Sequence, residues 1–228
     1  MDEFIYICYS FDTKLSGDIV QSCLAAIDTH ADSESGPLAQ DIRGSLLLSD
    51  SEEPITVTIG GLDYDLGVGS PALGNFDDEQ TVWIRVFGTH FQAPTAGAEA
   101  ARDNTSALIS LVTAIYETLV EQDYPVSYVY GFGPTEVQML LDGAVDVPAA
   151  QLAGSSVEAL FWLQILPPSR VSVLGEDRLL SAPAWRVEQV SDDGILLVVY
   201  DTPDPWVDGD SSRLDEVMDH LELEDPYE

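Results

Sequence analysis

The three histidines and two cysteines are the side chains best suited to acid–base or nucleophilic chemistry near neutral pH. None of His30, His90 and His220 stands beside a serine or cysteine in a nucleophile motif. Cys8 lies within an apolar, strand-like run, and Cys23 lies on the apolar side of a helix-like segment. A reactive thiol needs an exposed, electropositive environment, so we predict two buried thiols and no catalytic residue among these five.

A glycine-rich turn is the next candidate, because such turns can cradle phosphate groups. The segment YGFGPTE (130–136) places G-x-G between a predicted strand and a predicted helix. However, Glu136 stands where the third glycine would belong, and its charge would repel a phosphate at the helix start. We therefore predict that Gly131 and Gly133 form a tight structural turn and that Pro134 begins the helix.

Oxygen side chains are the remaining candidates for metal binding. Asp63 and Asp65 are two residues apart in a predicted strand and therefore share one face. Residues 208–219 carry oxygen side chains at four positions of a calcium-loop count, but Arg213 replaces the glycine that turns such a loop. The same region suits a helix cap at Ser212 followed by an amphipathic helix. We expect no bound metal and no cofactor.

The segment YDTPDPW (200–206) ends a strongly apolar strand with carboxylates and prolines. The prolines prevent strand pairing from continuing, so this acidic strand end acts mainly as a terminator. Because open sheets often bind ligands beyond their strand ends, Asp201 and Asp204 are candidate ligand-binding residues. Trp206 lies in a polar segment, where it either covers the core or anchors a partner. Asp201, Asp204 and Trp206 form our predicted partner-binding site.

Hydrophobic patterning assigns the elements that would position these residues. Single strands are predicted at 4–11, 81–88, 125–131 and 159–166. Two hairpins are predicted, one at 54–69 turning at Gly60-Gly61 and one at 187–200 turning at Asp193-Gly194, with Ile195–Tyr200 as a central strand covered on both faces. Helices are predicted from Asp12 or Thr13 to Ile27, from Asn104 or Thr105 to Leu119, over 135–143, over 167–175 and over 214–221.

This order predicts an α+β fold in which helices pack on a largely antiparallel sheet. The length suits a single domain spanning residues 1–228. The segment 144–156 is a candidate joint between two halves, 1–143 and 157–228.

Charge dominates the composition, because 41 acidic residues oppose eight basic ones and give a net charge of −33. So few cations cannot neutralise a run of phosphates, which excludes direct nucleic-acid binding. The acidity either presents carboxylates to a basic partner, binds polyvalent cations, or adapts the chain to concentrated salt. Because the acidic residues are spread along the whole chain, we favour the third interpretation, and the composition resembles that of proteins from extremely halophilic archaea.

The chain starts Met-Asp-Glu, without the basic start and long apolar core of a signal peptide. Its apolar runs are too short to span a bilayer. We expect a soluble, cytoplasmic protein that does not bind a membrane.

The segments ALFWLQILPPSRVSVLG (159–175) and VEQVSDDGILLVVYDTPDPWVDGDSSRLDEVMDHL (187–221) carry a strand, a short helix, a hairpin and a closing helix. Together they resemble the end of polymorphic-toxin immunity proteins of the immunity-52 type. Residues 102–131 are loosely similar to the helix and strand that precede this end. Gly194 stands alone where a glycine pair is typical, and the N-terminal third lies outside the resemblance. The resemblance implies a non-enzymatic protein that binds and blocks a toxin.

We therefore expect a soluble binding protein, an immunity-like inhibitor of a cognate toxin or another partner protein. Two alternatives stay open. One is a small-molecule enzyme that uses Asp201 and Asp204, and the other is a structural subunit of a larger assembly, with Trp206 or the apolar run 159–166 in its interface. The oligomeric state is left open.

Overall fold

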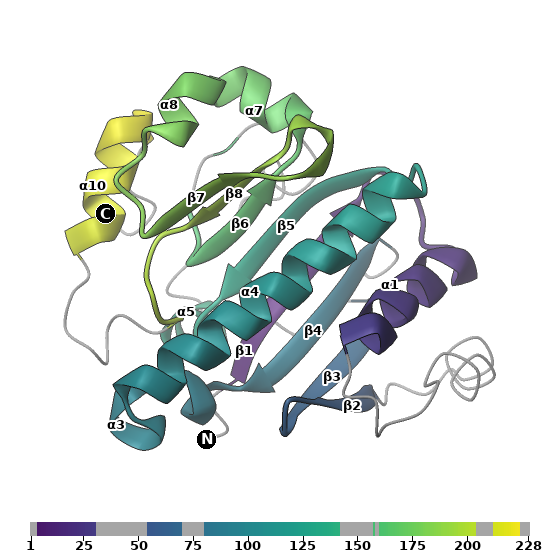
Figure 1. Ribbon diagram of the computed structural model, residues 1–228. Helices are drawn as coiled ribbons and strands as arrows, with labels where there is room; N and C mark the ends of the chain where they lie inside the picture. Colours follow the sequence, from purple (N-terminus) through teal and green to yellow (C-terminus); the bar gives the residue numbers. More distant parts are fainter. Residues whose placement is uncertain are drawn as a thin grey trace.

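One antiparallel sheet runs through the residues that the computed structural model describes, which are 4–30, 54–69, 80–141, 157, 160–203 and 212–223 (Figure 1). Its strands follow the order β2-β3-β4-β1-β5-β6-β8-β7, and every neighbouring pair is antiparallel. The predicted α+β class is therefore confirmed. The strands are β1 Phe4–Phe11, β2 Ile55–Ile59, β3 Leu62–Val68, β4 Thr81–Phe87, β5 Val126–Phe132, β6 Leu163–Leu166, β7 Arg186–Gln189 and β8 Ile195–Val198.

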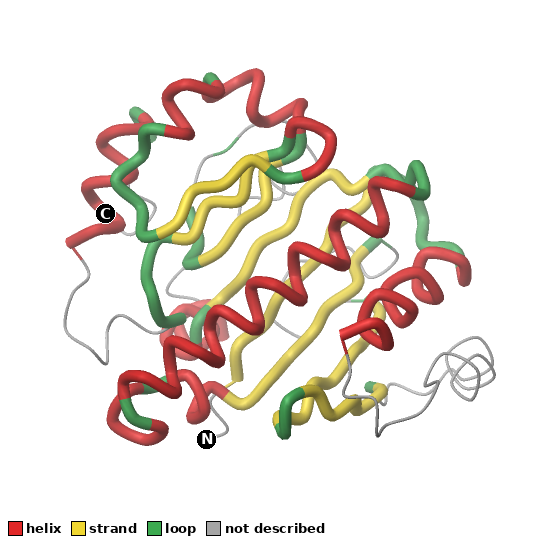
Figure 2. The backbone as a smooth tube through the Cα atoms, in the orientation of Figure 1, coloured by secondary structure: helices red, strands yellow, loops and turns green. Residues whose placement is uncertain are grey.

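Most of the helices gather in two places, and α5 packs against β1 and β5 (Figures 1 and 2). α1 and α4 lie side by side across one face of the sheet, and α7, α8 and α10 surround the end formed by β6, β8 and β7. The helices are α1 Gly17–His30, α3 Ala93–Ala96, α4 Ala98–Glu121, α5 Pro134–Leu141, α7 Pro168–Leu174, α8 Glu176–Leu180 and α10 Ser212–Leu221, with 3-10 turns η1 Gly88–Phe91 and η2 Ser191–Asp193.

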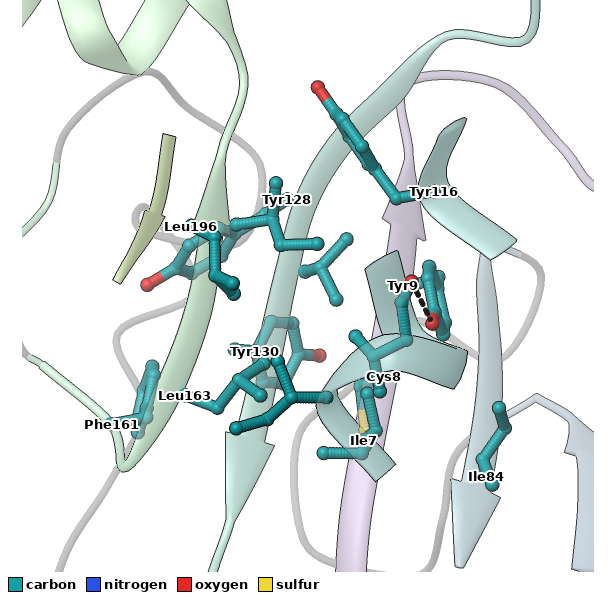
Figure 3. Packing of buried hydrophobic residues seen from close by; sticks show 14 of the residues in the cluster. Ile7, Cys8, Tyr9, Ile84, Tyr116, Tyr128, Tyr130, Phe161, Leu163 and Leu196 are labelled. Atoms are coloured by element: carbon teal, nitrogen blue, oxygen red, sulfur yellow. Dashed lines mark hydrogen bonds between the residues drawn. The ribbon is translucent and has the colours of Figure 1, made fainter. Parts of the chain in front are cut away.

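β1 lies inside the sheet between β4 and β5, as its almost wholly apolar sequence requires. The Tyr9 hydroxyl donates a hydrogen bond to the Val112 carbonyl of α4 at 3.0 Å, so Tyr9 points toward the helices (Figure 3). Because side chains alternate along a strand, Ile7 shares that direction and Cys8 points to the opposite face. This alternation defines the two faces of the sheet, one on the side of α4 and one on the opposite side.

The predicted apolar stripe of α4 is confirmed, but its predicted start is wrong. The helix begins at Ala98, preceded by Gly97 at φ +89°, so Asn104 and Thr105 lie inside it. These polar side chains are satisfied without capping the helix, since Asn104 Nδ2 donates to the His90 carbonyl and Thr105 Oγ1 donates to the Ala101 carbonyl.

α1 also starts later than predicted, at Gly17. The backbone N–H of Asp12 donates to the Pro125 carbonyl, which holds the chain extended beside β5 for longer than the sequence pattern indicated. The apolar positions of α1, including Ile19 and Cys23, are buried as expected.

The two predicted hairpins have different outcomes. Gly60 and Gly61 have φ values of +59° and +81°, which fit the two-residue turn predicted there. In the second hairpin the left-handed residues are Asp192 and Asp193, at +60° and +55°, whereas Gly194 has φ −74°. The prediction of a tight turn at Asp193-Gly194 is therefore wrong. Gly194 is required for space, because a Cβ there would lie 2.8 Å from the Tyr116 hydroxyl oxygen.

β8 is buried along its whole length, as predicted, but it is not central. It lies next to the edge strand β7, with α8 packed beside it. The neighbouring run is also inside the fold, since every residue from 160 to 166 is buried. This part of the run 159–166 therefore presents no surface for an assembly interface.

The glycine-rich turn before α5 is structural, as predicted. Pro134 begins the helix, and the Gly133 backbone N–H donates to Glu136 Oε2 at 2.7 Å. The glutamate thus occupies the place where a phosphate would have to bind. At the other end of the chain, the predicted apolar face of α10 is buried, whereas the joint 144–156 lies outside the described residues.

Candidate partner-binding surface

The strand register places a row of side chains across the face of the sheet opposite α1 and α4. Tyr6 pairs with Arg85, Arg85 with Asp65, and Asp65 with Thr56, so one row crosses β1, β4, β3 and β2. Residues in register on neighbouring antiparallel strands point to the same face. Since Tyr9 points toward α4, Tyr6 and its row point away from α4.

Arg85 is the centre of this row. Its Nε donates to Asp65 Oδ2 at 2.8 Å, and Asp65 Oδ1 accepts from the Thr56 hydroxyl at 2.6 Å. Burial lowers the pKa of Arg85, but hydrogen bonds with Asp65 and Tyr6 and the neighbouring charge outweigh burial, so the pKa is raised. The guanidinium is therefore a fixed positive charge in a chain that has few of them.

Aromatic rings surround the guanidinium on both sides. Its carbon lies 4.7 Å from the centre of the Phe4 ring and 5.7 Å from that of Trp83, which are cation–π distances. Phe4 in turn stacks at a tilt on Phe87, with ring centres 4.5 Å apart, and Tyr6 lies 5.9 Å from Trp83. We call Phe4, Tyr6, Asp65, Trp83, Arg85 and Phe87 the Arg85 surface.

Gly67 allows Trp83 to lie flat on β3. A Cβ at position 67 would be 2.0 Å from the indole Cζ2, so only glycine leaves room for this ring. The indole Nε1 is buried and has no hydrogen-bond partner among the residues that the structure describes. Trp83 is thus fixed by shape and by its ring contacts.

Part of the Arg85 surface is open to solvent. Phe87 is 42% exposed, Phe4 is half-buried, and the Arg85 side chain is 29% exposed. Trp, Tyr and Arg are the residue types that most often dominate binding energy at protein interfaces. A partly exposed set of aromatic rings around a positioned arginine is therefore suited to partner binding.

Sequence reasoning missed this surface, although the sequence contains its signal. In TVWIRVF (81–87), the aliphatic residues Val82, Ile84 and Val86 alternate with Trp83, Arg85 and Phe87. The first set faces α1 and α4 and is buried, and the second set faces the opposite side. The Trp83 ring is buried, and it also lies beside the Arg85 guanidinium.

Asp201, the one residue of the predicted strand-end site within the described ranges, lies away from the Arg85 surface. Asp201 is half-buried, and its carboxylate accepts a hydrogen bond from Arg102 Nε of α4 at 2.8 Å. It therefore contacts the helix that covers the other face of the sheet from the Arg85 surface. Asp204 and Trp206 lie outside the described residues.

The other residues considered for chemistry have structural contacts. Cys8 and Cys23 are free and fully buried, and burial raises the pKa of both thiols, that of Cys23 to about 12. His90 is exposed, and His220 Nε2 lies 3.0 Å from the Arg178 carbonyl oxygen. Within the described residues, no group of three His, Cys, Asp or Glu side chains is placed to hold a metal ion.

A buried arginine lies on α7, at the end of the sheet away from β2. Arg170 of α7 is fully buried, its Nε donates to the Ser127 carbonyl at 3.0 Å, and its guanidinium carbon lies 4.0 Å from the centre of the Tyr128 ring. Burial lowers the pKa of Arg170, and the neighbouring tyrosines and Asp12 oppose this. These contacts tie α7 to β5, which gives Arg170 a structural role.

Comparisons with known proteins identify no family for this chain. No family model matches the chain, and no curated protein matches it. Among solved structures it is similar to the "Pseudomonas aeruginosa T6SS protein PA0821", with a TM-score of 0.47 and 11% identity over 96% of this chain and 72% of that chain. A similarity at this level defines neither a family nor a function. None of the described helices has the length and apolar character needed to cross a bilayer.

Proposed function

We propose that this chain is a non-enzymatic binding protein that uses the Arg85 surface to bind a partner protein, in the manner of an immunity protein that neutralises a toxin. The observation that carries this proposal is the arginine held between Phe4 and Trp83 beside the exposed ring of Phe87. The resemblance of the C-terminal half to immunity proteins gives the proposal its direction.

The geometry favours binding because the surface is already organised. Asp65 and Tyr6 orient the guanidinium before a partner arrives, so little side-chain entropy is lost on association. Covering Phe87 would remove a large apolar ring from water, which is favourable in proportion to the area buried. Neither effect requires a catalytic group.

Charge and environment complete the proposal. A net charge of −33 would steer the chain toward a basic partner at low salt. We propose a cytoplasmic protein adapted to concentrated salt, where steering is screened and the aromatic contacts supply the affinity. We also propose Asp201, Asp204 and Trp206 as a second contact region on a chain that forms one domain.

Affinity purification from the organism that encodes the chain, in concentrated KCl, tests the proposal. The wild-type chain is expected to retain a stoichiometric partner, and Phe87→Ser and Arg85→Ala are expected to lose it. Leu180→Ser is the matched control, because Leu180 on α8 is 43% exposed and Phe87 is 42% exposed. Circular dichroism checks that each variant is folded. Failure to recover any partner, or equal recovery by all four chains, would contradict the proposal.

A further inference from the structure

Among the described strands, β2 lies at the edge of the sheet and has one partner. Ile55–Ile59 pairs with β3 on one side, and the strand order ends at β2 on the other. The two-residue turn at Gly60-Gly61 makes Ile59 and Leu62 a hydrogen-bonded pair. Hydrogen-bonded and non-hydrogen-bonded pairs alternate along an antiparallel ladder, so Ile55, Val57 and Ile59 bond to β3.

It follows that Thr56 and Thr58 direct their backbone N–H and C=O groups away from the sheet. These outward groups have no hydrogen-bond partner in the described part of the chain. Both threonine side chains are exposed, and each hydroxyl is used within the hairpin, where it donates to Asp65 or Asp63. With respect to the described residues, the outer edge of β2 is therefore a row of unpaired backbone donors and acceptors.

The two edges of the sheet differ in their protection. Natural edge strands usually prevent unwanted pairing with charged side chains, prolines, bulges or very short length. The other edge, β7, has four residues and carries the ion pair between Arg186 and Glu188. β2 has the sequence ITVTI, without charge, proline or a register shift within its five residues. The edge of β2 is therefore the one that permits pairing with a further strand.

We infer that the outer edge of β2 accepts an extended, basic segment of a partner protein as an additional antiparallel strand. This inference rests on the proposed function and names the chemistry of its partner. The basic character follows from charge complementarity, since exposed Asp63 and half-buried Asp65 lie on the neighbouring strand of a chain whose net charge is −33.

An added strand would continue the Arg85 surface. Its side chains opposite Thr56 and Thr58 would lie on the same face as those threonines, and this is also the face of Asp65 and Arg85. Backbone hydrogen bonds would supply affinity that is independent of sequence, and the side chains on this face would supply selectivity. One partner segment can thus contact both the edge and the aromatic surface.

Hydrogen exchange with a defined probe tests the inference. The probe is a capped peptide of about six alternating lysine and valine residues, a usual strand length, and the matched control peptide has glutamate in place of lysine. The buffer holds the lowest KCl concentration at which the chain stays folded. Saturating basic peptide is expected to slow exchange at the Thr56 and Thr58 amides at least about tenfold, and the acidic peptide is expected to leave it unchanged.

Three variants separate the backbone edge from the side chains. Thr58→Pro removes an outward N–H without breaking the β2–β3 ladder, and it is expected to weaken peptide binding at least about tenfold. Thr58→Val removes the hydroxyl and keeps the N–H, so it should bind as the wild type does. Gln189→Pro makes the same backbone change at the β7 edge, because Gln189 also directs its N–H away from the sheet. It should also bind normally.

The inference would be overturned by unchanged exchange at Thr56 and Thr58 in saturating peptide, or by wild-type binding of Thr58→Pro. Protection of these amides that rises with protein concentration alone would assign the edge to a second copy of the chain and would also overturn it. Retention of the native partner by Thr58→Pro, together with its loss in Phe87→Ser, would remove the edge inference and leave the proposed function standing.

Discussion

Arg85 and Asp65 join β4 to β3 through a hydrogen bond of 2.8 Å on the face of the sheet opposite α1 and α4. The pair holds a planar cation against the Phe4 ring, and Thr56 fixes the second oxygen of the carboxylate. An arginine in this position both stabilises the sheet and presents an organised surface. The two roles can be measured separately.

A double-mutant cycle on this pair is expected to give a coupling free energy of about 0.5–1 kcal/mol, because both groups are partly exposed and screened by solvent. The cycle uses Arg85→Lys, Asp65→Asn and the double variant, with stability measured by urea denaturation. Lysine keeps the charge but loses the planar geometry that suits carboxylates and aromatic rings. Additivity of the two single changes would show that the planar guanidinium contributes nothing beyond the charge that lysine keeps.

Gly67→Ala is expected to destabilise the chain by about 1–3 kcal/mol, because the new methyl group would overlap the Trp83 indole. The clash involves atoms that phenylalanine lacks. Trp83→Phe should therefore remove much of this cost, so the Gly67→Ala change should be milder in that background. Denaturation of the four chains, with tryptophan fluorescence as a second signal, measures the difference. An equal cost in both backgrounds would mean that the strand itself, and not the ring, resists alanine.

The buried thiols predict a loss of stability in alkali. Burial raises the pKa of Cys23 from 9.0 to about 12 and raises that of Cys8 as well. Above pH 9 the unfolded chain releases thiol protons that the folded chain keeps, so folding stability falls as pH rises toward the folded pKa values. The expected slope is about 1.4 kcal/mol per pH unit for each thiol.

Urea denaturation between pH 8 and about pH 11 measures this slope, the range being set by the thiol pKa values. Cys23→Ala should reduce it, since one titrating group is removed. Buried tyrosines such as Tyr64, whose pKa is raised by burial to about 12, add to the loss at the upper end. In the folded chain both thiols should resist a thiol reagent that labels them readily in denaturant. Rapid labelling of the native protein would contradict the buried placement.

The elements predicted correctly are those defined by local chemistry. Gly60-Gly61 allows a tight turn whatever surrounds it, and the apolar repeat of residues 108–119 defines a buried helical stripe. Helix starts depended on tertiary contacts instead. The sequence pattern starts this helix at Asn104 or Thr105, but the Asn104 amide donates to the His90 carbonyl on a distant turn, which no local pattern reveals.

The Arg85 surface could have been predicted only in part. The alternation of Trp83, Arg85 and Phe87 marks a face that differs from the aliphatic face of the same strand. Its meaning depends on which strands lie beside β4, because Phe4 and Asp65 come from β1 and β3. Strand order is set by long-range pairing. The predicted position of the second hairpin turn was wrong for a related reason. Gly194 is needed for space beside Tyr116, and that contact comes from a distant helix.

The net charge of −33 predicts that stability rises with salt, because mutual repulsion in the folded chain is screened. The thermal midpoint should increase with KCl concentration, by about 2–4 °C for each kcal/mol gained at this chain length. Sucrose, which strengthens burial without screening charge, serves as the control solute. A midpoint that rises equally in sucrose would assign the effect to exclusion of solute from the protein surface.

Two triple variants that remove the same charge sharpen this test. One changes Glu121, Asp123 and Asp219, near helix C-termini, to their amides, and the other changes Glu99, Asp177 and Asp215, in first helical turns. Helix dipoles disfavour the first set and favour the second, so at low salt the first variant should be more stable than the second. Both should flatten the salt dependence by similar amounts, since overall repulsion depends on total charge. A flattening confined to one variant would show that local helix-end interactions, and not the overall charge, cause the salt response.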